Sequence, residues 1–130
     1  MVARPLRVLL IEDSVLIRHG LSEAIDSGGT CRVANVADTA PQAIEHLRAE
    51  RFDVVIVDLQ LREGSGFDVL EFLQTREAFP APFTMVLTNH TQAAFRRRCA
   101  ACGVAHFFDK SLELERMLET LAAHALVVST

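Results

Sequence analysis

The fold is decided by the stretch Val54-Val55-Ile56-Val57-Asp58 near the middle of the chain. Its four apolar residues show no alternation with polar ones, which is typical of a strand covered on both faces. Similar short apolar runs occupy residues 7–11, 31–36, 83–87 and 105–108. The sequence therefore predicts five buried strands.

Longer amphipathic segments separate these runs. Apolar residues recur with helical spacing in residues 14–26, 39–50, 67–76, 92–102 and about 112–125. Ser111 is suited to cap the last helix. Strict alternation of strands and helices predicts an α/β domain with a single doubly wound parallel sheet, because crossovers between parallel strands are right-handed. The functional crevice of such a sheet lies at the carboxyl ends of its strands.

Size and charge limit the function. The chain has 130 residues and a formal net charge of −4, which indicates one domain and argues against a domain that binds nucleic acid directly. No apolar stretch has the length of a signal peptide core or a membrane span, so we expect a cytoplasmic protein with no membrane contact. Three cysteines without a secretion signal favour reduced thiols.

Chemically active residues follow four of the predicted strands. Glu12 and Asp13 end the first strand, Asp58 the third, Thr88 the fourth and Lys110 the fifth. The sheet should bring them together, and neighbouring carboxylates repel one another unless a cation neutralises them. Mg²⁺ suits such a set because it prefers oxygen ligands and phosphate. Asp58 could then attack phosphorus as a nucleophile and form an acyl phosphate.

Four segments together resemble the signatures of response-regulator receiver domains in two-component signalling. They are Val8-Leu9-Leu10-Ile11-Glu12-Asp13-Ser14, residues 54–61 followed by Gly64-Ser65-Gly66, Val86-Leu87-Thr88, and Phe107-Phe108-Asp109-Lys110. The last two segments look closest to receivers attached to helix-turn-helix regulators. The resemblance implies a flavodoxin-like sheet with strand order 2-1-3-4-5. It also implies one receiver over residues 1–130, without an output domain, that acts as a signalling switch and not as an enzyme.

The same resemblance implies roles for single residues. Asp58 would accept a phosphoryl group from a histidine kinase or a histidine phosphotransfer protein. Asp13 and Asp58 would bind Mg²⁺ directly, Glu12 through water, and Gln60 through its backbone carbonyl. Lys110 would contact a phosphate oxygen.

The resemblance also implies a switch. Thr88 would move toward the phosphate, and Phe107 would turn inward to fill the space that Thr88 leaves. The output, including a homodimer, would use the face formed by residues 92–102, 105–108 and 112–125. Gln60 and His90, each two residues beyond a site residue, would flank the phosphate and tune its hydrolysis.

Several residues depart from the family pattern. Ser111 replaces the proline that often follows the lysine, Arg62 stands where a proline is usual, and Phe107 lacks the hydroxyl of a tyrosine switch. The conformation of the loop around Ser111 therefore does not follow from the resemblance.

Other functions are weaker alternatives. A phosphatase-like hydrolase with an aspartate nucleophile would carry Asp-x-Asp on its first strand, but this strand ends in Glu12-Asp13-Ser14. A pseudo-receiver that only binds partners usually lacks one of the site residues, which are all present here. A redox role for Cys99 and Cys102 is disfavoured because the pair follows no strand and turn of thioredoxin type. A zinc site would need two more ligands, such as His90 and His106, whose spacing is irregular. The thiols are therefore expected to pack as small apolar groups. The run Arg96-Arg97-Arg98 indicates a solvated face or a partner contact.

Overall fold

A computed structural model of the chain describes residues 4–128, apart from the side chain of Arg76. Its strands are β1 (Leu6–Ile11), β2 (Cys31–Ala37), β3 (Val54–Val57), β4 (Phe83–Thr88) and β5 (His106–Asp109). Its helices are α1 (Val15–Ser27), α2 (Ala40–Ala49), α3 (Gly66–Leu73), α4 (Ala93–Ala101) and α5 (Leu114–Val128), with a short 3₁₀ helix, η1 (Arg76–Ala78). The predicted elements are confirmed, with ends shifted by at most three residues.

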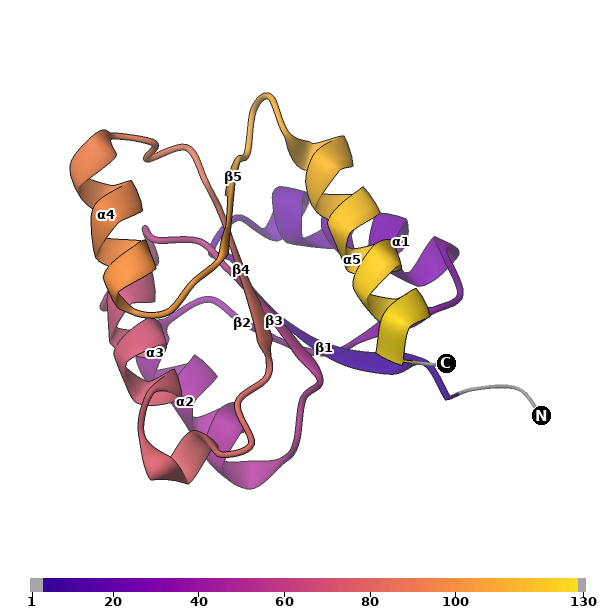
Figure 1. The fold of residues 1–130 in the computed structure, drawn as a ribbon, viewed down its shortest axis with the longest axis horizontal. Coiled ribbons are helices and arrows are strands. Elements are labelled where there is room, and N and C mark those ends of the chain that lie inside the picture. The colour runs from indigo at the N-terminus through magenta and orange to yellow at the C-terminus, as the bar shows by residue number, and fades with distance from the viewer. Residues whose placement is uncertain (1–3, 129–130) are drawn as a thin grey trace.

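The five strands form one parallel sheet in the order β2-β1-β3-β4-β5. Helices α2, α3 and α4 cover one face, and α1 and α5 cover the other (Figure 1). The flavodoxin-like, doubly wound fold is therefore confirmed. Among residues 4–128, no helix is long and apolar enough to cross a membrane.

The surroundings of strand β3 explain why residues 54–57 are all apolar. Its four residues are each at most 1% exposed. Val55 and Val57 belong to the core beneath α2, α3 and α4, whereas Val54 and Ile56 belong to the core beneath α1 and α5. Because successive side chains of a strand point to opposite faces and both faces are covered, every position must be apolar.

The beginning of α5 differs from the prediction that Ser111 caps it. The helix begins at Leu114, and Asp109 organises the preceding turn. The carboxylate of Asp109 accepts hydrogen bonds from the backbone N–H groups of Ser111 (2.8 Å) and Leu112 (3.2 Å). The Glu113 carboxylate in turn accepts one from the Asp109 N–H, at 3.0 Å. Asp109 thus holds the backbone of the turn before α5, and the Ser111 hydroxyl donates to Asn89 instead of capping the helix.

The cysteines behave largely as predicted. Cys99 is buried in the core beneath α4, and Cys102 packs against the same core while partly exposed. Burial raises the pKa of the Cys99 thiol to about 11, which keeps it protonated and unreactive at neutral pH.

Candidate functional site

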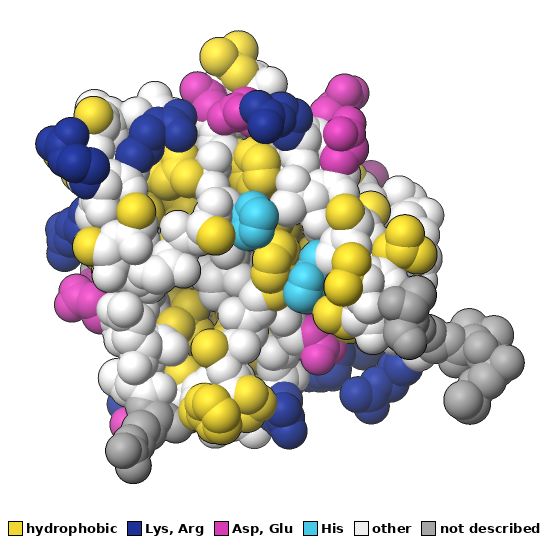
Figure 2. Space-filling view, viewed as in Figure 1, with side chains coloured by type: hydrophobic (Ala, Val, Ile, Leu, Met, Phe, Trp, Pro, Cys, Tyr) yellow, Lys and Arg dark blue, Asp and Glu magenta, His cyan; other side chains and the backbone are white. Residues whose placement is uncertain are grey.

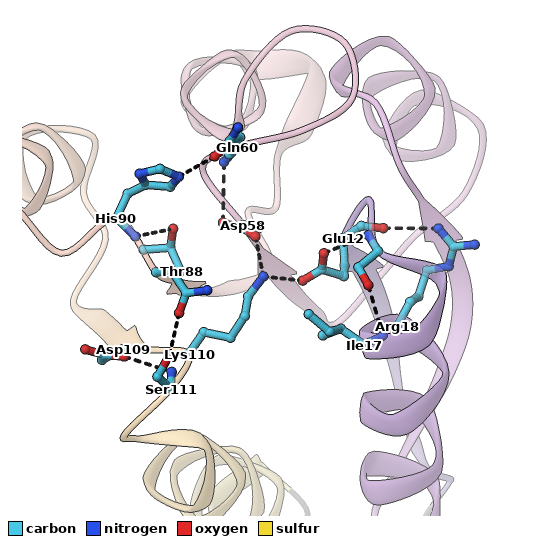
Figure 3. A network of polar contacts seen from close by, with 12 residues as sticks. Glu12, Ile17, Arg18, Asp58, Gln60, Thr88, His90, Asp109, Lys110 and Ser111 are labelled. Atoms are coloured by element: carbon cyan, nitrogen blue, oxygen red, sulfur yellow. Dashed lines mark hydrogen bonds and ion pairs between the residues drawn. The ribbon is translucent and has the colours of Figure 1, made fainter.

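The predicted residues meet at the carboxyl edge of the sheet, where strands β1, β3, β4 and β5 end. An open hollow at this edge is lined by Glu12, Asp13, Ser14, Ile17, Asp58, Gln60, Asn89, His90 and Lys110. Figure 3 shows the Lys110 ammonium lying between the carboxylates of Asp58 and Glu12, although 98 positions separate Lys110 from Glu12 along the chain. The parallel topology therefore gathers these groups as the sequence predicts.

Three charged side chains form the floor of this hollow: Glu12, Asp58 and Lys110. The Lys110 Nζ lies 2.5 Å from Glu12 Oε1 and 2.5 Å from Asp58 Oδ2. Glu12 is 2% exposed and Asp58 6%, so water screens these ion pairs only weakly. Burial alone would lower the pKa of Lys110, but its bonds to Asp58 and Glu12 outweigh burial and raise it above the ordinary 10.5. Lys110 is therefore a fixed cation beside Asp58.

Backbone bonds hold the floor in place. The Asp58 N–H donates to the Ile11 carbonyl at 3.0 Å, and the Lys110 N–H donates to the Thr88 carbonyl at 2.9 Å. The second oxygen of Glu12 accepts the N–H of Ser14 at 2.9 Å. Each floor carboxylate thus has a defined orientation before any ligand binds.

Gly66 lets α3 begin directly against the Asp58 turn. A Cβ at this position would lie 2.3 Å from the Asp58 carbonyl oxygen and 2.8 Å from the Leu59 Cα. The Gly66 N–H donates to the Leu59 carbonyl at 2.9 Å, and Ser65 and Asp68 form a capping box at the helix start. The Gly64-Ser65-Gly66 signature therefore has a steric cause.

Asp13 differs from the floor carboxylates. It is half-buried and lines the hollow, but no hydrogen bond or ion pair joins its carboxylate to another of residues 4–128. Asp13 is therefore the site carboxylate whose oxygens remain free for a ligand from solvent.

A divalent ion is compatible with these donors. Asp13, Asp58 and Gln60 line one hollow and offer hard oxygen atoms, which Mg²⁺ prefers. Within residues 4–128, no three acidic, histidine or cysteine side chains are already arranged as a ligand set. Lys110 instead provides the positive charge between Glu12 and Asp58. The same absence of a ligand set among residues 4–128 gives no support to a zinc site at Cys99 and Cys102.

Thr88 ends strand β4 and is fully buried. Its hydroxyl oxygen accepts the backbone N–H of His90 at 3.1 Å. The threonine side chain is thus tied to the loop that leads into α4, and movement of its hydroxyl must disturb this loop.

We call four polar side chains the rim of the hollow: Gln60, Asn89 and His90, which line it, and Ser111, which contacts Asn89. Gln60 Oε1 and His90 Nε2 are hydrogen bonded to each other. The Ser111 hydroxyl donates to Asn89 Oδ1 at 2.8 Å. Sequence reasoning selected Gln60 and His90 but missed Asn89 and the contact of Ser111. The only available signal was the replacement of the usual proline by a residue with a hydroxyl.

The face formed by α4, β5 and α5 carries the predicted aromatic residue and basic run. Figure 2 shows basic side chains over α4, with histidine and apolar side chains toward α5. Phe107 is half-buried, and the Arg96 guanidinium lies 4.4 Å from its ring centroid. Arg98 stacks on Phe67 at 4.0 Å. Two of the three arginines therefore cover aromatic rings of the domain itself.

Sequence comparison identifies relatives. Residues 8–122 match the family described as "Response regulator receiver domain". The response regulator protein FleR of Pseudomonas aeruginosa is 33% identical over 122 residues, which are 92% of this chain and 24% of that protein. The chain spans less than half of the length of the first curated relatives that it matches.

Solved structures agree with the observed fold. The non-phosphorylated receiver domain of HemR from Leptospira biflexa has a TM-score of 0.80 and 30% identity, with 94% of each chain covered. A LuxR-family two-component response regulator from Aurantimonas sp. SI85-9A1 has a TM-score of 0.82 and 22% identity, with 95% of this chain and 86% of that chain covered. Receivers of such helix-turn-helix regulators are thus among the structural neighbours, as predicted.

Proposed function

Because the chain belongs to the response regulator receiver domain family, we propose that it is a phosphorylation-dependent signalling switch with Asp58 as the phosphoryl acceptor. Switching by phosphorylation is typical of this family, and Mg²⁺ binding accompanies it. The observation that carries the proposal is the Lys110 ammonium, 2.5 Å from Asp58 Oδ2 in an open hollow bordered by the free carboxylate of Asp13. This arrangement fits a negatively charged phosphodonor.

The proposed chemistry is a single phosphoryl transfer. A carboxylate oxygen of Asp58 attacks phosphorus, the bond from phosphorus to the donor breaks, and the donor's leaving group departs with the electron pair. Lys110 contacts a phosphoryl oxygen and neutralises part of its charge. Asp13, Asp58 and the Gln60 carbonyl would hold Mg²⁺, with Glu12 acting through water. When bound, Mg²⁺ would supply further positive charge against the phosphoryl oxygens.

The proposed output begins at Thr88. The new phosphoryl group adds close to two negative charges, and the Thr88 hydroxyl leaves the His90 N–H to donate to it. This shift moves the loop before α4 and makes room for Phe107. The Arg96 guanidinium on the Phe107 ring must then move as well. Changes at Asp58 therefore reach the face formed by α4, β5 and α5, which we expect to bind an output partner or a second copy.

Receiver domains interact with kinases and other signalling proteins. For this chain we propose a histidine kinase or a histidine phosphotransfer protein as donor, in the cytoplasm, with no direct contact to nucleic acid or membrane. Receivers typically signal without being enzymes, although some relatives carry an enzymatic domain elsewhere in a longer chain. We propose that residues 1–130 form the receiver.

Mass spectrometry with acetyl phosphate and Mg²⁺ tests the proposal. Wild type should gain the mass of one phosphoryl group, and Asp58→Asn should gain none. Asp53→Asn is a matched control, because Asp53 binds the Arg7 N–H at the other end of strand β3; it should be phosphorylated like wild type. Stoichiometric labelling of Asp58→Asn would contradict the proposal. Absence of labelling in wild type would favour a pseudo-receiver, and continuous release of phosphate without a labelled intermediate would favour a hydrolase.

A further inference from the structure

The side chain of Asn89 is placed to meet a ligand above Asp58. Asn89 directly follows Thr88 and lines the same hollow as Asp58 and Lys110. It is exposed, so it contributes little to the core. Its amide carries one acceptor, Oδ1, and one donor group, the Nδ2 amino group. Which end faces the hollow therefore decides whether Asn89 attracts or repels an anion.

Ser111 contacts one end of this amide. The Ser111 hydroxyl donates to Asn89 Oδ1 at 2.8 Å, which leaves the amino group as the free end of the amide. Among residues 4–128, no acceptor contacts Asn89 Nδ2. A flipped amide would place two donors against each other unless the serine hydroxyl also turned to accept. The present arrangement thus presents an unused N–H donor at the rim.

Both partners are held by their own loops. The Ser111 N–H donates to Asp109 Oδ1 at 2.8 Å, which anchors Ser111 to the turn after β5. The next residue after Asn89, His90, is fixed by its N–H bond to the Thr88 hydroxyl. The Asn89–Ser111 contact therefore connects the loop that follows Thr88 with the loop that follows Lys110. A proline at 111 has no hydroxyl and could not make this contact.

We propose that Asn89 is a further phosphoryl-binding residue, whose amino group donates to a terminal oxygen of the group on Asp58, and that Ser111 is the positioning residue that orients it. This inference rests on the proposed function, because it concerns the phosphoryl group at the same site. A neutral amide donor attracts an anion without adding a second positive charge beside Lys110. Asn89 thus complements the lysine.

Fluorine NMR of bound beryllofluoride tests the contact directly. This phosphoryl mimic carries three fluorines in place of three oxygens, so each bound fluorine reports on its own donors. In the presence of Mg²⁺, Asn89→Ala should shift one bound fluorine signal far more than the others. Affinity for beryllofluoride should fall roughly tenfold, as expected for a hydrogen bond to a charged group. An unchanged fluorine spectrum and affinity would overturn the inference.

Serine variants separate orientation from folding. Ser111→Ala should weaken beryllofluoride binding by about twofold to threefold, which is the lower range for one hydrogen bond, and Ser111→Thr should restore it. In Asn89→Ala, the further change Ser111→Ala should have no additional effect, because the two residues act through one contact. Additive losses in the double variant would contradict the positioning role of Ser111.

Two controls keep this test distinct from that of the proposed function. If wild type gives no bound fluorine signals, or if Asp58→Asn keeps them, the proposed function fails. If wild type binds and Asn89→Ala behaves like wild type, only the Asn89 inference fails. In wild type, the side-chain amino signals of Asn89 should also shift on adding beryllofluoride. This measurement needs no variant, and unchanged amino signals would overturn the inference.

Discussion

The floor and the rim of the hollow differ in burial and in the kind of contact that holds their side chains. The floor residues Glu12 and Asp58 are nearly inaccessible to solvent and are joined by Lys110 at 2.5 Å on each side. The rim consists of exposed or half-buried side chains joined in pairs, Gln60 with His90 and Asn89 with Ser111. Buried charges depend strongly on each other, whereas exposed hydrogen bonds compete with water. The floor should therefore decide whether the phosphoryl group is accepted and the rim how long it stays.

The largest effect is expected when a site carboxylate is removed. Asp13→Ala should slow phosphorylation by acetyl phosphate roughly a hundredfold or more, because the charge stabilisation that a metal supplies is worth several kcal/mol. The fold should persist, since no bond joins the Asp13 carboxylate to residues 4–128. Phosphoryl incorporation followed by mass spectrometry, with circular dichroism for folding, checks this. Asp38→Ala removes a carboxylate bound to Arg62 outside the hollow and should react normally. Labelling of Asp13→Ala at the wild-type rate would remove its metal role.

Removal of Lys110 should affect stability as well as chemistry. Lys110→Met leaves Glu12 and Asp58 without their shared cation, and we expect a loss of about 3 kcal/mol in unfolding free energy at pH 7. Ser111→Ala, at the rim, should cost within about 0.5 kcal/mol. Urea unfolding of both variants measures this difference. Equal losses of unfolding free energy in the two variants would contradict the different contributions to stability that we assign to the floor and the rim.

The lysine effect also has a defined pH dependence. The pKa of Lys110 is raised in the folded state because its bonds to Asp58 and Glu12 outweigh burial. Its stabilising contribution is therefore fully present below pH 10.5, the ordinary pKa of a lysine, and is lost as the pH rises through the higher pKa of the folded state. The stability difference between wild type and Lys110→Met should shrink only in that alkaline range. A difference that disappears near pH 8 would show that the ion pairs do not hold Lys110 as described.

Thr88 connects the hollow with the loop before α4 through its hydrogen bond to His90. Removal of its hydroxyl should therefore leave phosphorylation intact but weaken the response of the output face formed by α4, β5 and α5. Thr88→Ala should still accept a phosphoryl group at Asp58. Amide NMR signals of residues 88–102 and 105–111 should respond to beryllofluoride much less than in wild type, because the hydroxyl that couples the site to the α4 loop is missing. Signals of α1 and α2, apart from residues 13–14, should change little in either protein. A full remote response in Thr88→Ala would rule out this coupling.

The smallest effects are expected at the first rim pair. Changing Gln60 or His90 to Ala should alter the rate of phosphoryl loss several-fold, because both side chains line the hollow and, in the proposed function, flank the phosphoryl group. Unfolding free energy should change by no more than about 0.5 kcal/mol. Phosphoryl lifetimes after removal of acetyl phosphate, together with urea unfolding, measure both quantities. Equal lifetimes in all variants would exclude a tuning role for this pair.

The floor could be predicted from the sequence because it follows from topology. Strand β3 had to be apolar on both faces, and the ends of parallel strands had to meet, so Asp58 and Lys110 were expected together. The resemblance to receivers also selected Thr88 and Phe107, whose roles stay proposals. Sequence alone did not indicate that Lys110 would lie between Glu12 and Asp58 and form an ion pair with each.

The rim was less predictable for a physical reason. The contacts of Gln60 with His90 and of Asn89 with Ser111 join exposed side chains that are 30 and 22 positions apart. Such contacts depend on rotamers and loop positions that hydrophobic patterns do not encode. Ser111 was interpreted as a helix cap because serine is common there, but Asp109 at the end of β5 already serves the backbone of that turn.

The most direct test of the central claim is to locate the phosphoryl group along the chain. Borohydride reduces an aspartyl phosphate to an alcohol and releases phosphate, which leaves a permanent mark at the modified residue. After treatment with acetyl phosphate, Mg²⁺ and borohydride, peptide mass spectrometry should find this change at Asp58 alone. A mark at Glu12 or Asp13, or a phosphorylated protein that borohydride leaves unmarked, would contradict the assignment of Asp58.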